Sequence, residues 1–145
     1  MTISRRLLIF LASILSATLT LNAQDLPQDK QQSLDFMAQA DEIMAATRAI
    51  DIAREQMIMA ANYDTTNIKA NFEAGHMHIE SIGKDLAVKY FLRIYRQNPN
   101  YRFDLEYWIG KAYQYGLKFD KAIDFYTRYR TKVKSKSGVA TQAAR

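Results

Sequence analysis

The sequence predicts an all-α fold built from stacked helix pairs, and three observations support this prediction. The composition favours helix over sheet, because the 145 residues include only two prolines and five glycines. No segment alternates apolar and polar residues with the two-residue period of a strand. A pattern of small and aromatic residues recurs 35 positions later, where Gly75, Ala87 and Phe91 are matched by Gly110, Ala122 and Tyr126. Repeats of this period are typical of stacked helix pairs.

Residues 1–23 resemble a secretory signal peptide. Arg5 and Arg6 form a short basic start, an apolar run follows, and Asn22-Ala23 precedes a polar stretch. The run is shorter than the roughly 20 apolar residues that a membrane-spanning helix needs. We therefore expect cleavage after Ala23 and export to the periplasm or cell envelope; an uncleaved membrane anchor is the alternative. The two arginines loosely match a twin-arginine signal, and an ordinary basic start is the simpler interpretation.

The first helix pair is expected over residues 34–67, after a polar lead-in at 24–33 that contains Pro27. Apolar residues recur there at helical spacing on two segments separated by a turn near Thr47–Ala49. They are Leu34, Met37, Ala38, Ala40, Ile43 and Met44 on the first, and Ile50, Ala53, Met57, Ala60 and Ala61 on the second. Asn62–Asn67 is rich in residues that form turns and cap helices.

The second pair is expected over residues 68–100. Its first helix should run from about Thr66 to Ile82, and Gly83 should end it. The partner helix should span Asp85–Arg96, because the residue before Pro99 is biased away from helical backbone angles.

The third pair is expected over residues 101–134. Tyr101–Tyr115 and Phe119 to about Val133 should be its helices, with Gly116 in the turn. Residues 135–145 lose the helical period, as a linker or the start of a further helix would.

Glycine inside a helix lowers helix stability by about 1 kcal/mol relative to alanine, so its recurrence at the same repeat position indicates a role in packing. Close approach of the two helices of a pair would account for it. Gly110 would let the second helix lie against the first with Ala122 at the contact, while Tyr113 and Tyr126 fill the gaps on either side. Gly75, Ala87, His78 and Phe91 would do the same in the preceding pair.

These landmarks resemble the tetratricopeptide repeat (TPR), a helix-turn-helix unit of 34 residues. The third pair matches the family pattern at Ile109, Gly110, Tyr113, Phe119, Ala122 and Tyr126. The second pair matches it at Ala74, Gly75, Ala87, Phe91 and Pro99, with His78 in place of an aromatic residue. Residues 34–67 look like a degenerate first copy, in which Asp41 falls where a small residue is expected, and Glu106 stands where the family has tryptophan. The resemblance implies a TPR-like α-solenoid of about three repeats.

The resemblance also implies a function, namely a non-enzymatic scaffold that binds a peptide or helix of a partner protein in a concave groove. The family's groove positions correspond to Phe72, His76, Ile79 and Glu80 in the second pair, and to Tyr107, Lys111, Gln114 and Tyr115 in the third. Aromatic residues beside a cation suit such a partner. The alternative is a structural module at the N-terminus of a larger envelope protein. The chain is similar there to bacterial proteins whose repeats precede a β-propeller and an OmpA-like, peptidoglycan-associated domain.

Residues that could carry chemistry have simpler explanations, so we expect no enzyme, cofactor or metal site. The chain has no cysteine, which excludes disulfides and thiolate chemistry. His76 and His78 lie two residues apart, about 200° around a helix, so they cannot grip one ion comfortably. We expect His78 to be packed and His76 to face the groove. Asp120 and Asp124 lie beside Lys121 and Arg128, as on a solvated helix face.

The basic charge of the chain is concentrated near its end. The net charge is +5, yet residues 24–124 carry 12 basic and 15 acidic side chains and are therefore net −3. Arg128, Arg130, Lys132, Lys134 and Lys136 supply most of the excess. A solvated helix end explains them, and electrostatic contact with an anionic membrane surface or an acidic partner is the alternative. Together with the predicted export, this distribution argues against nucleic acid as the partner.

Overall fold

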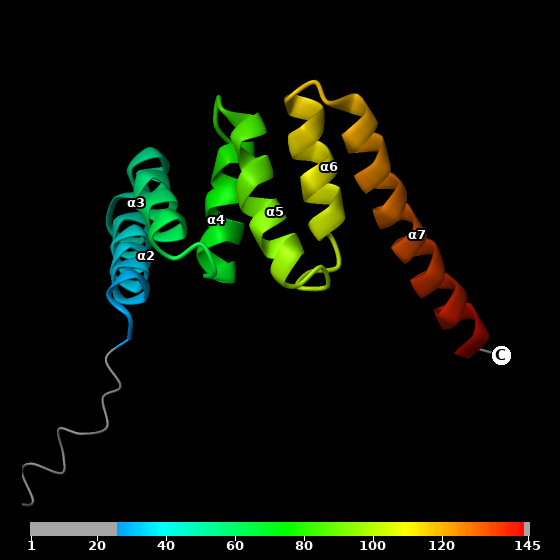
Figure 1. Cartoon of the computed structure of the whole chain (residues 1–145), viewed down its shortest axis with the longest axis horizontal. Coiled ribbons are helices and arrows are strands. Elements are labelled where there is room, and N and C mark those ends of the chain that lie inside the picture. The colour runs from blue at the N-terminus through cyan, green and yellow to red at the C-terminus, as the bar shows by residue number, and fades with distance from the viewer. Residues whose placement is uncertain (1–25, 144–145) are drawn as a thin grey trace, which may run out of the picture.

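The computed structural model describes residues 26–143, and its side chains are described over residues 26–136. The predicted signal peptide and its cleavage after Ala23 lie outside this range. The described chain forms six α-helices and one short 3₁₀ helix and contains no strand, which confirms the all-α prediction. Figure 1 shows the helices side by side in a row, from α2 to α7.

The helices follow one another as packed neighbours. Their bounds are Gln28–Thr47 (α2), Ile50–Tyr63 (α3), Ile68–Ile79 (α4), Ala87–Gln97 (α5), Leu105–Tyr115 (α6) and Phe119–Ala143 (α7), with the 3₁₀ helix η1 at Lys84–Leu86. Within pairs, α2 packs on α3, α4 on α5 and α6 on α7; the pairs are joined by contacts between α3 and α4 and between α5 and α6. This order is that of a helical repeat.

Several helix ends differ from the sequence-based expectation; helix α4, for example, ends at Ile79 rather than at Ile82. Helix α2 begins at Gln28, within the segment 24–33 that was predicted to be a polar lead-in, because the carbonyl of Pro27 accepts the first helical hydrogen bonds. Helix α6 begins at Leu105 rather than at Tyr101. Helix α7 continues to Ala143, so much of the segment 135–145 extends this helix instead of forming a linker.

The predicted turns between the helices are present, and two of them use a left-handed residue that is not glycine. Arg48 has φ 55° between α2 and α3, inside the predicted turn. Leu117 has φ 56° between α6 and α7, whereas the adjacent Gly116 has φ −84°. Asn67 caps α4, its side-chain oxygen accepting a hydrogen bond of 3.0 Å from the amide of Ala70. This cap confirms the expected role of the Asn-rich turn.

The recurring glycines lie directly beneath aromatic rings. A Cβ atom added to Gly75 would lie 2.7 Å from the Phe91 ring, and one added to Gly110 would lie 2.7 Å from the Tyr126 ring. Neither separation leaves room for a methyl group. The prediction that glycine permits close packing is confirmed, but the ring, rather than the small Ala122, occupies the space over the glycine.

Ring contacts also recur at the 35-residue offset. His78 stacks on Tyr90 with centroids 5.4 Å apart, and the equivalent rings of Tyr113 and Phe125 stack at 5.8 Å. Phe72 and Phe91 are 5.9 Å apart, as are their equivalents Tyr107 and Tyr126. The second and third pairs therefore share their internal packing as well as their sequence landmarks.

Two separate hydrophobic clusters form the core. One is lined by small and flexible side chains, namely Met37, Ala40, Ala53, Met57, Ala60, Ala61, Ala70 and Ala74, together with Tyr90. The other contains Phe72, Ile79, Ala87, Phe91, Ile94, Leu105, Ile109, Ala112, Tyr113 and Ala122. The adjacent residues Tyr90 and Phe91 belong to different clusters, so α5 contributes to both.

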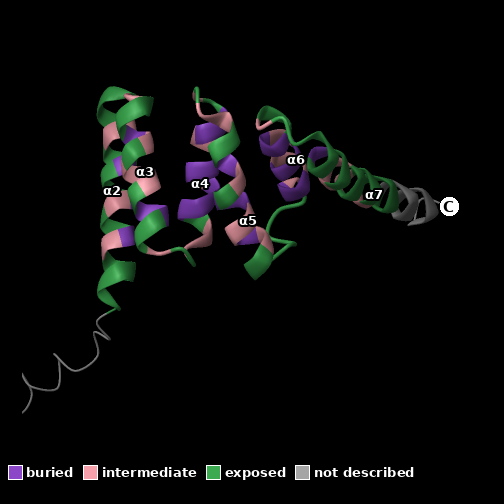
Figure 2. Ribbon diagram, turned by 45° about the horizontal axis from the view of Figure 1, so that its top comes forward, coloured by how far each residue is buried: buried purple, intermediate pink, exposed green. Residues whose placement is uncertain are grey.

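Burial is uneven along the row of helices. Figure 2 shows buried residues concentrated on α4, α5 and α6, whereas most of α7 is exposed.

In the first pair Ala40 is buried and Asp41, where the small residue was expected, is exposed. Alanine therefore supplies the small side chain of this pair, one position before Asp41. At the 35-residue offset, the buried positions 40, 75 and 110 are thus all filled by a small residue.

Candidate partner-binding surface

Helices α4 and α6 meet through an aromatic contact that the sequence did not identify. The ring of His76 lies edge-on to Trp108 with centroids 4.4 Å apart. The indole Nε1–H of Trp108 donates a hydrogen bond of 2.9 Å to Asp104 Oδ2, which fixes the orientation of the ring. Trp108 is half-buried, so part of this ring remains open to a partner.

Asp104 is itself held by a neighbouring cation. Arg102 Nε donates a hydrogen bond of 2.9 Å to Asp104 Oδ1, and this bond lowers the pKa of the Asp104 carboxyl. The guanidinium of Arg102 also lies 4.5 Å from the centroid of the Phe72 ring. The start of α6 is therefore a rigid arrangement of charge and aromatic surface that presents Trp108.

A second aromatic residue and a cation extend this surface along α6. Tyr107 lies 5.3 Å from Trp108, centroid to centroid. The ammonium of Lys111 lies 5.2 Å from the Trp108 centroid and 5.9 Å from that of Tyr107. Lys111 thus places a positive charge over two ring faces, an arrangement that can hold an apolar or aromatic side chain next to a carboxylate.

The far end of the surface is formed by Tyr115 and Glu80. Tyr115 is 43% exposed, and Lys84 Nζ lies 5.2 Å from its ring centroid. Glu80 is largely exposed, with its Oε1 atom 3.7 Å from His76 Nδ1. We call the set His76, Glu80, Tyr107, Trp108, Lys111 and Tyr115 the aromatic–cationic surface.

Five of the eight residues predicted for the groove lie on this surface, and three do not offer a free side chain. Phe72 and Ile79 are buried, only 6% and 5% exposed, because they pack in the aromatic cluster. The prediction that Phe72 and Ile79 contact a partner is therefore wrong, because both side chains are buried. Gln114 is exposed, but its Oε1 accepts a hydrogen bond of 2.7 Å from the Tyr126 hydroxyl.

The surface also contains residues that the sequence analysis passed over. Trp108 was not among the residues assigned to the groove, although its position between Tyr107 and Lys111 was the available signal. Lys84 contacts Tyr115 from the 3₁₀ helix η1, and Arg102 holds Asp104, the hydrogen-bond partner of Trp108, from the loop before α6. Their contribution depends on tertiary packing.

The two histidines lie on different sides of α4, as expected. His76 faces α6, whereas His78 is buried against Tyr90 of α5. Burial lowers the pKa of His78, and the charges of Lys89 and Arg54 lower it further. Across residues 26–143 no three His, Cys, Asp or Glu side chains are grouped so that they could hold a metal ion.

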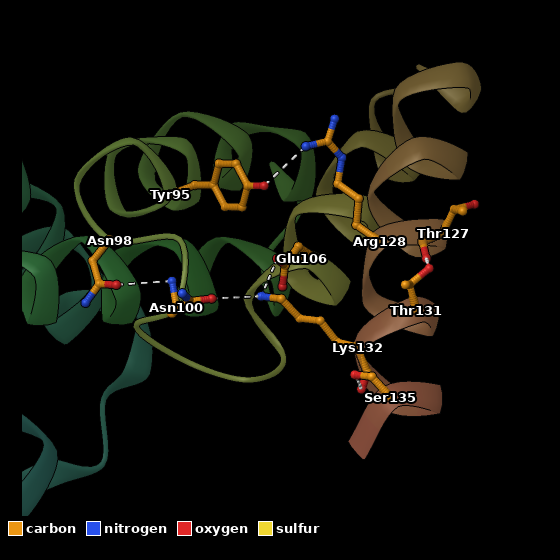
Figure 3. Close-up of polar contacts among 9 residues, drawn as sticks. All are labelled: Tyr95, Asn98, Asn100, Glu106, Thr127, Arg128, Thr131, Lys132 and Ser135. Carbon is orange, nitrogen blue, oxygen red and sulfur yellow. Dashed lines mark hydrogen bonds and ion pairs between the residues drawn. The ribbon is translucent and has the colours of Figure 1, made fainter. Parts of the chain in front are cut away.

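Three basic residues on one face of α7 contact neighbouring side chains. Lys132 Nζ lies 2.5 Å from Glu106 Oε1 and donates to Asn100 Oδ1 at 3.4 Å (Figure 3). Arg128 binds Asp124 and the Tyr95 hydroxyl, and Lys136 lies 4.8 Å from the Phe103 centroid. These three cations lie four residues apart along one face and hold α7 to its neighbours.

None of the helices in the described part of the chain combines the length and apolarity that crossing a membrane requires. Comparison of the chain with family models, with curated proteins and with solved structures gives no match.

Proposed function

We propose that this chain is a non-enzymatic protein-binding scaffold of the TPR type. It would hold an extended segment or a helix of a partner protein against the aromatic–cationic surface of α4 and α6. The observation that carries the proposal is the His76–Trp108 contact at 4.4 Å, because it joins the exposed faces of two successive repeat units into one continuous surface.

The charges on this surface favour a partner segment that combines apolar and acidic side chains. Lys84 and Lys111 lie over aromatic rings, so a carboxylate can approach the cation while an apolar group contacts the ring. By contrast, Arg128, Lys132 and Lys136 of the basic segment already contact neighbouring side chains. We therefore propose that the partner binds α4 and α6 and that a membrane surface is not one of the main contacts of this chain.

Site-specific photo-crosslinking tests this proposal. A benzophenone amino acid replaces Tyr115, which is 43% exposed on the surface, or Tyr63, which is 41% exposed on α3 and serves as the matched control. We expect a discrete crosslinked partner from position 115 in intact cells, and its loss when Lys111→Glu is added. Equal crosslinking from both positions, or a product that persists with Lys111→Glu, would contradict the proposed surface.

We also propose that the chain is exported and acts in the periplasm or cell envelope. This proposal rests on the basic start and apolar run of residues 1–23. N-terminal sequencing of the protein from envelope fractions tests it, with Gln24 as the expected first residue. Recovery of Met1 in the membrane fraction would instead indicate a retained anchor.

A further inference from the structure

Helix α7 carries a seam of mostly apolar side chains beside its contact with α6, and the half-buried Tyr126 of this seam also packs on Gly110. Phe119, Ile123, Tyr126, Arg130 and Val133 follow one another at alternating spacings of four and three residues, as in the seam of a coiled coil. Phe119 is 55% exposed, Ile123 63% and Val133 39%. We call these five residues the α7 stripe.

The preceding repeat unit shows what such a stripe normally contacts. Thirty-five positions earlier, Val88, Phe91 and Tyr95 of α5 correspond to Ile123, Tyr126 and Arg130. All three belong to or pack against the cluster that spans α4 to α7, where Phe91 lies over Gly75 of its own pair and Tyr95 contacts Phe125. Within residues 26–143 no following helix covers the equivalent side of α7. Phe119, Ile123 and Val133 of the stripe therefore expose apolar surface that no helix in the described part of the chain covers.

Charges beside the stripe have opposite signs at its two ends. Asp120, Thr127 and Lys134 lie seven residues apart along one edge, so the edge begins acidic, passes through a neutral residue and ends basic. A second α7 running antiparallel would place each Asp120 opposite a Lys134. A parallel copy would instead bring this edge against the opposite edge of its partner, so that Asp120 and Lys134 would not meet.

The side chains of the stripe are compatible with the same antiparallel register. In that register Ile123 of one copy faces Val133 of the other, and Arg130 faces the Tyr126 ring, where a cation–π contact accommodates the charge. A shallow hollow of about 160 Å³ lined by Ile123, Tyr126, Thr127 and Arg130 lies near the midpoint of the stripe. The hollow would lie at the two-fold axis and receive side chains of the other helix.

We propose that the α7 stripe is a homodimer interface, in which two copies of this chain pair through antiparallel α7 helices. The interface is isologous, so one patch serves both subunits and the assembly closes at two. It lies on α7, whereas the aromatic–cationic surface lies on α4 and α6; the two adjoin where Tyr126 meets Tyr107, and a dimer would carry two aromatic–cationic surfaces. The proposal therefore does not depend on the proposed partner.

Sedimentation of the purified chain tests the dimer over about 1 to 100 μM, the range in which mass action separates it from a monomer. Ile123→Lys should weaken dimerisation at least about 100-fold, because each dimer loses two apolar contacts and gains two charges at the seam. Ile82→Lys is the matched control, since Ile82 is fully exposed in the turn before η1. A chain that stays monomeric, or a dimer that resists Ile123→Lys, would overturn the proposal.

Cysteine crosslinking tests the antiparallel orientation, and the native chain contributes no cysteine of its own. Thr127→Cys should form a disulfide-linked dimer on mild oxidation, because Thr127 lies near the axis. Asp120→Cys alone should not, since the two cysteines would be about 21 Å apart along the helices. Mixing Asp120→Cys with Lys134→Cys should restore crosslinking. Efficient self-crosslinking of Asp120→Cys would show a parallel pair and overturn the antiparallel assignment.

Discussion

Lys132 of α7 neutralises the carboxylate of Glu106, which α6 places in the interior at only 2% exposure. The two residues are 26 positions apart, and their 2.5 Å contact links the last two helices near the start of α6. Glu106 occupies the position at which the preceding repeat buries Asn71. Both repeats therefore place a polar side chain at the same point in their packing.

We expect Lys132→Met to destabilise the protein by about 2 to 4 kcal/mol, because it leaves a buried carboxylate without a counter-charge. Adding Glu106→Leu should recover most of this loss, since an apolar pair replaces the ion pair. Urea denaturation followed by circular dichroism measures both effects. Lys118→Met, at an exposed lysine in the turn before α7, should change stability little. A similar loss of stability in Lys118→Met would show that removing any positive charge destabilises the protein, and that the ion pair with Glu106 is not the cause.

Gly110→Ala should destabilise the protein by about 1 to 2 kcal/mol, although alanine is the better helix former. The added methyl group would lie 2.7 Å from the Tyr126 ring, so the ring or the helix must move. Thermal unfolding measures the loss. The double variant Gly110→Ala/Tyr126→Leu should lose less stability than the sum of the two single variants, because the smaller side chain relieves the clash. A more stable Gly110→Ala variant would contradict the close packing.

His78 should make stability depend on pH in the weakly acidic range. Its pKa is lowered in the folded protein, so the unfolded chain binds more protons as the pH falls. The stabilising contribution of neutral His78 is complete above its unfolded pKa near 6.5 and is lost progressively below it. His78→Tyr, which copies Tyr113 of the next repeat, should therefore gain more stability relative to the parent at pH 5 than at pH 7. Denaturant titrations at both pH values measure the difference, and an equal effect would contradict the assignment.

Asp104→Ala should loosen Trp108 and cost about 1 to 2 kcal/mol of stability, since the indole N–H and Arg102 both lose their acceptor. Trp108 is the single tryptophan of the chain, so its fluorescence reports on this site alone. We expect lower anisotropy and emission at longer wavelength. Asp120→Ala, at an exposed carboxylate on α7, should leave both signals unchanged. Unaltered fluorescence in the Asp104 variant would show that packing alone positions the ring.

Local patterns in the sequence predicted the features that depend on spacing along one helix or across one repeat. The close approach of the helices at Gly110 and the burial of His78 fall in this class, although Ala122 and not Tyr126 was expected over the glycine. A repeated glycine opposite a repeated aromatic residue restricts how the helices can pack, and that restriction is visible without coordinates.

Features set by contacts between distant residues were not predictable. Glu106 would be assigned to the surface by its charge, and only the approach of Lys132 makes its burial favourable. Phe72 and Ile79 occupy groove positions of the family but pack inward in this chain. Leu117 adopts the left-handed conformation beside a glycine that sequence reasoning would choose for it.

Because Tyr90 and Phe91 are adjacent yet buried in different clusters, α5 is the element through which the two halves of the core are energetically coupled. In a linear array of repeats, stability propagates between nearest neighbours, so the ends can open while the centre stays folded. Amide hydrogens of α5 should therefore exchange most slowly, and those of α2 should exchange through local opening. A substitution at Tyr90 would then uncouple the first helix pair and produce two unfolding transitions in place of one.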